Sequence, residues 1–214
     1  AAEARQIVGY AHAAAGELDE AERAFDAIAS IEGKAYVALE RGDLDRAAEL
    51  AASAGSAYGQ AVRGKALMRQ GRLDEAAQAF NAAAKQDAAD WQRAEALAGR
   101  GRLRQQAGDT DAALQDYQQA IAMDAFNADA LSNAGDAYRS AGDLEAAQHT
   151  IERAAARGVQ DDLMAMMLRQ IQEDRAAGAD AARSEMISRQ VKDLEARYRE
   201  QRAAGTDRPV DEWT

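Results

Sequence analysis

A six-residue pattern that begins with Gly and ends with Ala occurs five times in this chain of 214 residues. The copies are Gly16–Ala21, Gly42–Ala47, Gly71–Ala76, Gly108–Ala113 and Gly142–Ala147. Each copy lies between two stretches with helical periodicity, so each is predicted to be the turn of a helical hairpin. The glycine can adopt the left-handed conformation that ends a helix, and an Asp directly after it can cap the next helix. Five copies in the same order predict an all-α repeat protein.

Small residues also occupy equivalent places in the helix before each turn. They are Gly9, Ala35, Gly64, Gly101 and Gly135. Because Gly inside a helix costs about 1 kcal/mol relative to Ala, its repeated use predicts close passage of the partner helix. After most turns a larger residue follows the closing Ala by four positions, as at Phe25, Phe80, Tyr117 and Ile151. This spacing places the larger residue and the Ala on one face of the second helix.

The combined pattern resembles the tetratricopeptide repeat (TPR) family. The best copy runs from about Ala128 to Asp161 and the resemblance covers roughly Ala2 to Gly158. It implies an α-α superhelix of about five hairpins, whose first helices line a concave surface that binds a peptide or partner protein. The turn glycines are 26 (16 to 42), 29 (42 to 71), 37 (71 to 108) and 34 (108 to 142) residues apart. The short early intervals predict truncated helices, and the long third interval predicts an insertion around Asp87–Trp91.

We therefore divide the chain into a TPR-like solenoid at 1–160, C-terminal capping helices at 161–204, and a linker or truncated tail at 205–214. A break between the capping helices is predicted at Ala177–Ala179. The helix after it carries an apolar stripe, Ile187, Val191, Leu194 and Tyr198. This stripe suits a cap over the last repeat, and a dimer-forming or partner-binding helix is the alternative.

Composition argues against several classes of function. The net charge of −11 argues against nucleic acid as the main partner, because phosphate neutralisation needs clustered Lys and Arg. No apolar run is long enough to insert into a membrane. The chain has no Cys, and its two histidines, His12 and His149, are far apart in sequence. We therefore expect no metal site, no cofactor and no catalytic site.

The resemblance implies that outward residues of the first helices contact the partner. The predicted site residues are Tyr58, Lys65, Arg69, Arg102, Gln105, Gln106, Asn133, Asp136 and Arg139. Asn133 with nearby basic residues partly resembles the family's carboxylate clamp, although the full residue set is absent. Locally, Arg93, Arg100, Arg102 and Arg104 predict a basic patch for an acidic partner, unless pairing within the helix neutralises it.

The preferred interpretation is a non-catalytic interaction scaffold within a larger bacterial protein, the bacterial source being suggested by abundant Ala and Arg. One alternative is a structural protein that forms homo-oligomers through the solenoid ends or the C-terminal helix. The other is an accessory domain of an enzyme or of a secretion or envelope machine. The chain begins at Ala1 without Met, so we expect a removed signal peptide or a fragment. A removed signal peptide would favour the periplasm over the cytoplasm.

Overall fold

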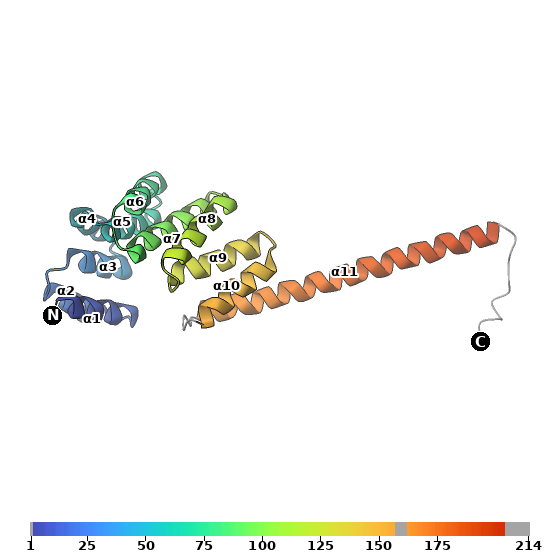
Figure 1. Cartoon of the computed structure of the whole chain (residues 1–214), viewed down its shortest axis with the longest axis horizontal. Helices are drawn as coiled ribbons and strands as arrows, with labels where there is room; N and C mark the ends of the chain where they lie inside the picture. Colours follow the sequence, from blue (N-terminus) through green and yellow to red (C-terminus); the bar gives the residue numbers. More distant parts are fainter. Residues whose placement is uncertain (1, 157–161, 204–214) are drawn as a thin grey trace. The chain divides into compact units, whose positions relative to one another are not determined.

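The structure is a computed structural model that describes residues 2–156 and 162–203, and the secondary structure in these ranges is α-helical (Figure 1). The helices are α1 (Ala2–Ala14), α2 (Leu18–Asp26), α3 (Ile31–Arg41), α4 (Leu44–Ala54), α5 (Ala57–Arg69), α6 (Leu73–Lys85), α7 (Asp90–Gln106), α8 (Thr110–Met123), α9 (Ala128–Ser140), α10 (Leu144–Ala156) and α11 (Asp162–Ala203). The chain forms two compact units, Ala1–Leu168 and Arg169–Thr214. Helices α1–α10 build five antiparallel hairpins in the first unit, which confirms the predicted all-α solenoid.

The ten helices of the hairpins form two layers. Contacts join α1 to α3, α3 to α5, α5 to α7 and α7 to α9, and we call these five helices the inner layer. Helices α2, α4, α6, α8 and α10 form the outer layer, and each packs against its neighbours in the chain. The inner layer is therefore the one that presents side chains from successive repeats beside one another.

The turns between paired helices have the predicted geometry. All five turn glycines have positive φ, between 77° and 84°. The Oδ1 atoms of Asp43, Asp109 and Asp143 accept hydrogen bonds of 3.3, 3.2 and 3.0 Å from the backbone N–H three residues later. A left-handed residue followed by a carboxylate cap thus ends one helix and starts the next within two positions.

The glycines inside the inner helices lie against large side chains of the outer helices. A Cβ on Gly64 would lie 2.6 Å from the ring of Phe80, and a Cβ on Gly99 would lie 2.2 Å from the same ring. Equivalent approaches occur at Gly9 with Phe25, Gly101 with Tyr117 and Gly135 with Ile151, at 2.5–2.6 Å. The predicted close passage of the paired helices is confirmed.

The irregular turn spacing has two structural causes. The early helices are short, with 9 residues in α2 and 11 in each of α3 and α4. The long third interval contains α7, which has 17 residues. Trp91 belongs to the first turn of α7, so the extra length predicted as an insertion around Asp87–Trp91 lies largely in a longer helix.

The predicted break at Ala177–Ala179 is wrong, because α11 continues through it. One glycine costs only about 1 kcal/mol in a helix, which is less than the loss of the surrounding backbone hydrogen bonds. Ile187 and Val191 are half-exposed. The side chains of Leu194 and Tyr198, and the predicted tail at 205–214, lie outside the described residues, so the capping role stays a prediction.

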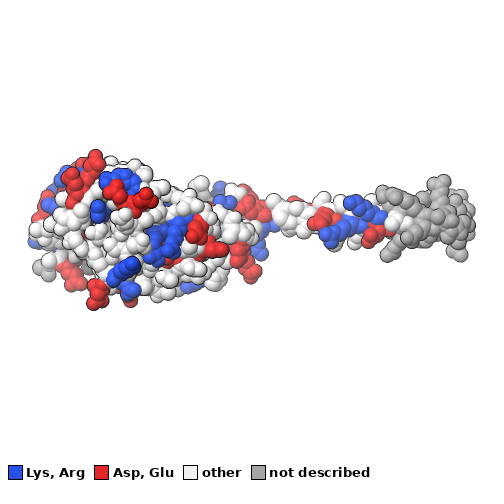
Figure 2. All heavy atoms as spheres, turned by 90° about the horizontal axis from the view of Figure 1, so that it is seen from above, with Lys and Arg blue, Asp and Glu red and all other residues white. Residues whose placement is uncertain are grey.

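The surface carries charges of both signs. Figure 2 shows acidic and basic side chains near one another over one face of the helical hairpins, and neither sign covers that face. None of the helices within residues 2–156 and 162–203 is long and apolar enough to cross a membrane.

Candidate functional site

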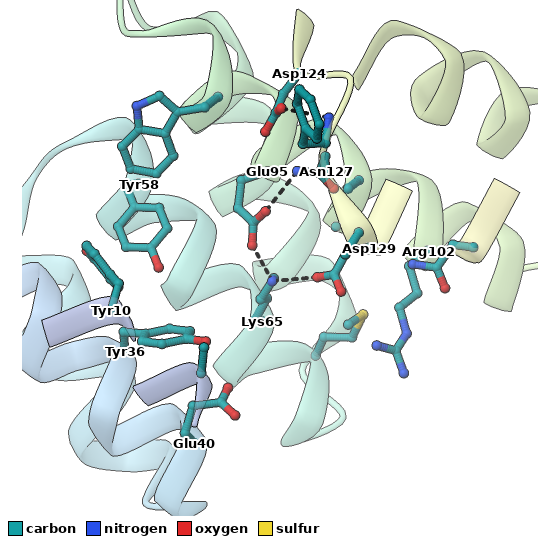
Figure 3. Close-up of a pocket in the computed structure, with 18 of the residues that line it drawn as sticks. Tyr10, Tyr36, Glu40, Tyr58, Lys65, Glu95, Arg102, Asp124, Asn127 and Asp129 are labelled. Carbon is teal, nitrogen blue, oxygen red and sulfur yellow. Dashed lines mark hydrogen bonds and ion pairs between the residues drawn. The ribbon is translucent and has the colours of Figure 1, made fainter. Parts of the chain in front are cut away.

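Four consecutive helices of the inner layer each contribute one aromatic ring to a continuous row. Tyr10 of α1, Tyr36 of α3, Tyr58 of α5 and Trp91 of α7 form this row, which we call the aromatic ladder. Ring centroids are 5.7 Å apart for Tyr10–Tyr36, 5.7 Å for Tyr10–Tyr58 and 5.2 Å for Tyr58–Trp91. These separations are typical of favourable aromatic pairs. The three tyrosines lie close together in Figure 3.

The aromatic ladder forms one side of a groove with a volume of about 880 Å³. Besides the ladder, its lining includes Glu3, Glu40, Lys65, Arg69, Glu95, Arg102, Asp124, Phe126, Asn127, Asp129 and Asn133. They come from all five inner helices and from the loop before α9. The groove therefore follows the surface that the stacked inner helices share.

A partly buried ion cluster joins three inner helices at the centre of the groove. The ammonium of Lys65 on α5 donates to Glu95 on α7 and to Asp129 Oδ2 on α9, the latter at 2.7 Å. Asn127 adds a 3.1 Å hydrogen bond to Glu95, and its own oxygen caps α9. Figure 3 shows these contacts as dashed lines, with the tyrosines on one side of Lys65 and Arg102 on the other. We call Lys65, Glu95 and Asp129 the ion cluster.

The charges in the ion cluster stabilise one another. Burial alone would lower the pKa of Lys65, but the carboxylates of Glu95 and Asp129 outweigh burial and raise it. The nearby ammonium of Lys65 lowers the pKa of Asp129. Lys65 of α5 and Asp129 of α9 therefore keep opposite charges at neutral pH.

Burial keeps the phenols of the aromatic ladder protonated. It raises the pKa of Tyr10 to about 12, and it also raises the pKa values of Tyr36 and Tyr58. The Tyr10 hydroxyl is enclosed beside the polar groups of Gln6 and Tyr58, which oppose part of the effect of burial on its pKa. The phenols of the ladder are therefore neutral at ordinary pH.

The groove brings together five of the nine predicted site residues. Tyr58, Lys65, Arg69, Arg102 and Asn133 line it, although Tyr58 is only 7% exposed because it packs within the ladder. Gln105, Gln106, Asp136 and Arg139 lie outside this lining. Their contribution to binding stays a prediction.

Three of the four predicted residues outside the lining have local contacts, and the fourth is exposed. Gln105 donates to Asp136 at 2.8 Å and accepts from the Tyr117 hydroxyl at 2.8 Å. Asp136 also pairs with Arg139 at 3.3 Å, and Gln106 is exposed. These polar groups therefore hold α7, α8 and α9 together beside the groove.

The predicted basic patch on α7 does not form one surface. Arg100 and Arg104 pair with the buried Asp116 of α8, at 2.6 and 2.9 Å, and Arg93 lies 3.7 Å from Asp90. Of the four arginines, only Arg102 lines the groove. Successive positions of a helix point in different directions, which separates residues that are close in sequence.

Sequence reasoning missed Tyr10, Tyr36, Trp91 and Phe126 as groove residues. A signal for the first two was present, since each lies six positions before a turn glycine, Gly16 or Gly42. The short early repeats concealed this register. Trp91 was assigned to an insertion and Phe126 to a turn between repeats, so neither was placed on the inner surface.

No group of three or more His, Cys, Asp and Glu side chains in the described ranges is arranged to hold a metal ion. The carboxylates at the centre of the groove contact Lys65, and the phenols are protonated. The groups that line the groove are therefore suited to packing and hydrogen bonding with a bound molecule.

Two family models match the chain, and both describe the same family. One family model described as tetratricopeptide repeat matches residues 61–128, and a second with the same description matches residues 105–171. Together they cover more than half of the chain. No curated protein matches the chain in sequence.

Solved structures have the same fold at low sequence identity. TTC0263, a TPR protein of Thermus thermophilus, has 21% identity and a TM-score of 0.66, over 80% of this chain and 99% of that chain. Pseudomonas aeruginosa pilF has 17% identity and a TM-score of 0.59, over 84% and 87%. YrrB, described as a TPR protein with an unusual peptide-binding site, has 18% identity and a TM-score of 0.50, over 76% and 89%.

Proposed function

Because this chain belongs to the tetratricopeptide repeat family, we propose that its groove binds an extended or helical segment of a partner protein, without catalysis. TPR proteins generally mediate protein–protein interaction, and the fold is typically a non-catalytic scaffold. YrrB, which shares the fold, is described as having a peptide-binding site. The family and the fold thus support an interaction role, and the composition of the groove supports this surface as the proposed binding site.

The aromatic ladder is the observation that carries the proposal. Tyr and Trp are enriched among the residues that dominate binding energy at protein interfaces. Trp91 is 42% exposed and Phe126 is 62% exposed, so both offer ring surface that the fold does not bury. A groove of about 880 Å³ lies within the size range of binding pockets.

Polar groups at the other end of the groove supply hydrogen-bond donors. Arg102 and Asn133 line the groove and make no hydrogen bond with another described residue. Their guanidinium and amide groups are suited to donate to backbone carbonyl oxygens of the bound segment. Arg69 has a lesser part, because its guanidinium already donates to the carbonyl oxygen of Leu39 at 2.8 Å.

Selection from a library of random linear peptides on the full chain tests the proposal. We expect Trp91→Ala to weaken binding of a selected peptide by at least about tenfold, which is typical of removing an aromatic anchor. Leu73→Ala is the matched control, because Leu73 is similarly exposed, at 46%, and does not line the groove. Equal affinities for the Trp91→Ala variant and the unchanged chain would contradict binding in the groove, as would failure to select any peptide.

A further inference from the structure

We propose that the aromatic ladder receives a basic side chain, Lys or Arg, of the bound partner segment. This inference rests on the proposed function, because it assigns the partner's chemistry at the same groove. It differs from the sequence-based expectation of an acidic partner, which depended on a basic patch that the fold divides between α7–α8 contacts and the groove.

The surroundings of the ladder are negative. Among the residues that line the groove, five carry carboxylates (Glu3, Glu40, Glu95, Asp124 and Asp129) and three are cationic (Lys65, Arg69 and Arg102). The one cation at the centre, Lys65, is already bound by two carboxylates. The central cluster therefore keeps an excess negative charge, and a carboxylate placed beside it would be repelled.

The pKa of the Tyr36 hydroxyl reflects the same negative surroundings. Burial is the main cause of its raised pKa, and Glu40, Glu95 and Asp129 raise it further, while Lys65 alone opposes them. A cation near Tyr36 would be attracted by these three carboxylates and repelled by Lys65 and by Arg69, which lies beside Glu40. Glu40 is exposed at this end, 3.8 Å from Arg69, and can accept hydrogen bonds from an arriving ammonium or guanidinium.

The rings themselves favour a cation over an anion. The faces of Tyr and Trp carry partial negative charge and attract ammonium and guanidinium groups within about 6 Å of the ring centre. The long stem of Lys or Arg can pack on the rings while the charged head reaches a carboxylate.

The rest of the chain attracts the same kind of partner. With a net charge of −11, the protein produces a field that speeds encounter with basic segments and slows encounter with acidic ones. Arg102 lies at the opposite end of the groove from the tyrosines, on the far side of Lys65 (Figure 3). Its guanidinium is therefore left to the backbone carbonyl oxygens of the segment.

The first test is the composition of the peptides selected on the full chain. We expect Lys or Arg next to an apolar residue to be enriched over the library. Peptides enriched in Asp or Glu, or without any preference for charge, would overturn the basic-partner inference. The proposed function would still stand if their binding remained sensitive to Trp91→Ala. If no peptide were selected, both the function and this inference would fail.

The second test places the basic side chain at the ladder. The chain has two tryptophans, Trp91 and Trp213, so the variant Trp213→Phe leaves Trp91 as the single fluorescent reporter in the groove. Its emission is titrated with a selected peptide whose two ends are chemically capped, so that only side chains carry charge. Replacing the basic residue of this peptide by Gln should weaken binding by about tenfold, the loss expected for a cation–π contact together with an ion pair.

The variant Glu40→Gln should weaken binding of the basic peptide by about fivefold, and should leave the Gln-containing peptide unaffected. Glu49→Gln is the matched control, because it removes the same charge from an exposed position on the outer helix α4. Circular dichroism should show unchanged helix content for both variants. Equal effects of Glu40→Gln and Glu49→Gln would show that only the overall charge matters, and would overturn placement at the ladder.

Discussion

Phe80 illustrates how single residues determine the spacing of these helices. Its ring lies between Gly64 of α5 and Gly99 of α7, so one outer side chain contacts the backbones of two successive inner helices. Phe25 has the same position between Gly9 and Gly33. Each ring fills space that a Cβ would occupy, and the glycines therefore determine how closely adjacent repeats approach.

The variant Gly64→Ala should lower the free energy of unfolding by about 1–3 kcal/mol, even though Ala is the better helix former, because the Phe80 ring cannot move away from the added methyl group. Urea unfolding measures this change. Gly178→Ala in α11 is the control, since no atom lies within 4 Å of its added Cβ. It should not destabilise the protein, and unchanged stability of Gly64→Ala would contradict the packing described.

Only part of this residue-level pattern was predictable. Gly9, Gly64, Gly101 and Gly135 could be recognised because they keep a similar register before the turns. Gly33 and Gly99, which face the outer helix of the preceding repeat, were missed. Each lies nine positions before a turn glycine, but the other three repeats have no Gly at that position. The partners of Lys65 were equally hidden, because Asp129 is 64 positions away and its contact depends on how the repeats stack.

At the scale of helices, α7 and α8 are held together by a buried charged group. Asp116 of α8 is 1% exposed and accepts hydrogen bonds from Arg100 at 2.8 and 2.6 Å. Arg104 pairs with the same carboxylate at 2.9 Å, and Arg100 also donates to Asn81 of α6. The cluster connects three helices on the side of α7 opposite its contact with the groove.

Replacing Asp116 by Asn should destabilise the chain by about 3 kcal/mol, because two arginines would lose their buried counter-charge. Chemical denaturation of the variant gives this value directly. Asp111→Asn, in the exposed first turn of α8, provides a control with the same change of group. If Asp116→Asn lost no more stability than Asp111→Asn, the contacts of Asp116 with the two arginines would contribute little to the stability of the fold.

Helix boundaries were predicted best where local chemistry determines them. The turns with Gly and an Asp cap act within a few residues, so sequence reasoning placed the five hairpins correctly. It failed at Ala177–Ala179, where one glycine was interpreted as a break although nothing else ends the helix. Sequence reasoning also missed that the extra residues between the turn glycines Gly71 and Gly108 belong largely to a longer α7. Helix length depends on tertiary packing as well as on local signals.

On the scale of the whole solenoid, the ion cluster gives stability that depends on pH. The pKa of Asp129 is lowered in the folded state, so its contribution is present above the unfolded pKa of about 4 and is lost as the pH falls through the lowered folded value. The pKa of Lys65 is raised, so its contribution is complete below about pH 10 and is lost only as the pH rises through the raised value.

Lys65→Met should therefore cost about 1–3 kcal/mol near neutral pH, because Glu95 and Asp129 would face each other without the ammonium. The difference from the unchanged chain should be smaller at pH 3, which lies below the unfolded pKa of about 4, because the contribution of Asp129 is lost as the pH falls toward its lowered folded pKa. Urea unfolding of both proteins, near neutral pH and at pH 3, measures this difference in the free energy of unfolding. A difference in the free energy of unfolding that is the same at both pH values would contradict an electrostatic role for Lys65.

The contacts of the aromatic ladder and the ion cluster also affect cooperativity. In an ideal repeat array each unit contacts only its neighbours, so repeats can open one at a time. Here Tyr10 of α1 touches Tyr58 of α5, and Lys65 of α5 reaches Asp129 of α9, so each contact passes over one inner helix. Opening a middle hairpin therefore disturbs the hairpins on both sides of it. The surface that lines the groove is accordingly the part of the solenoid least able to unfold piecemeal.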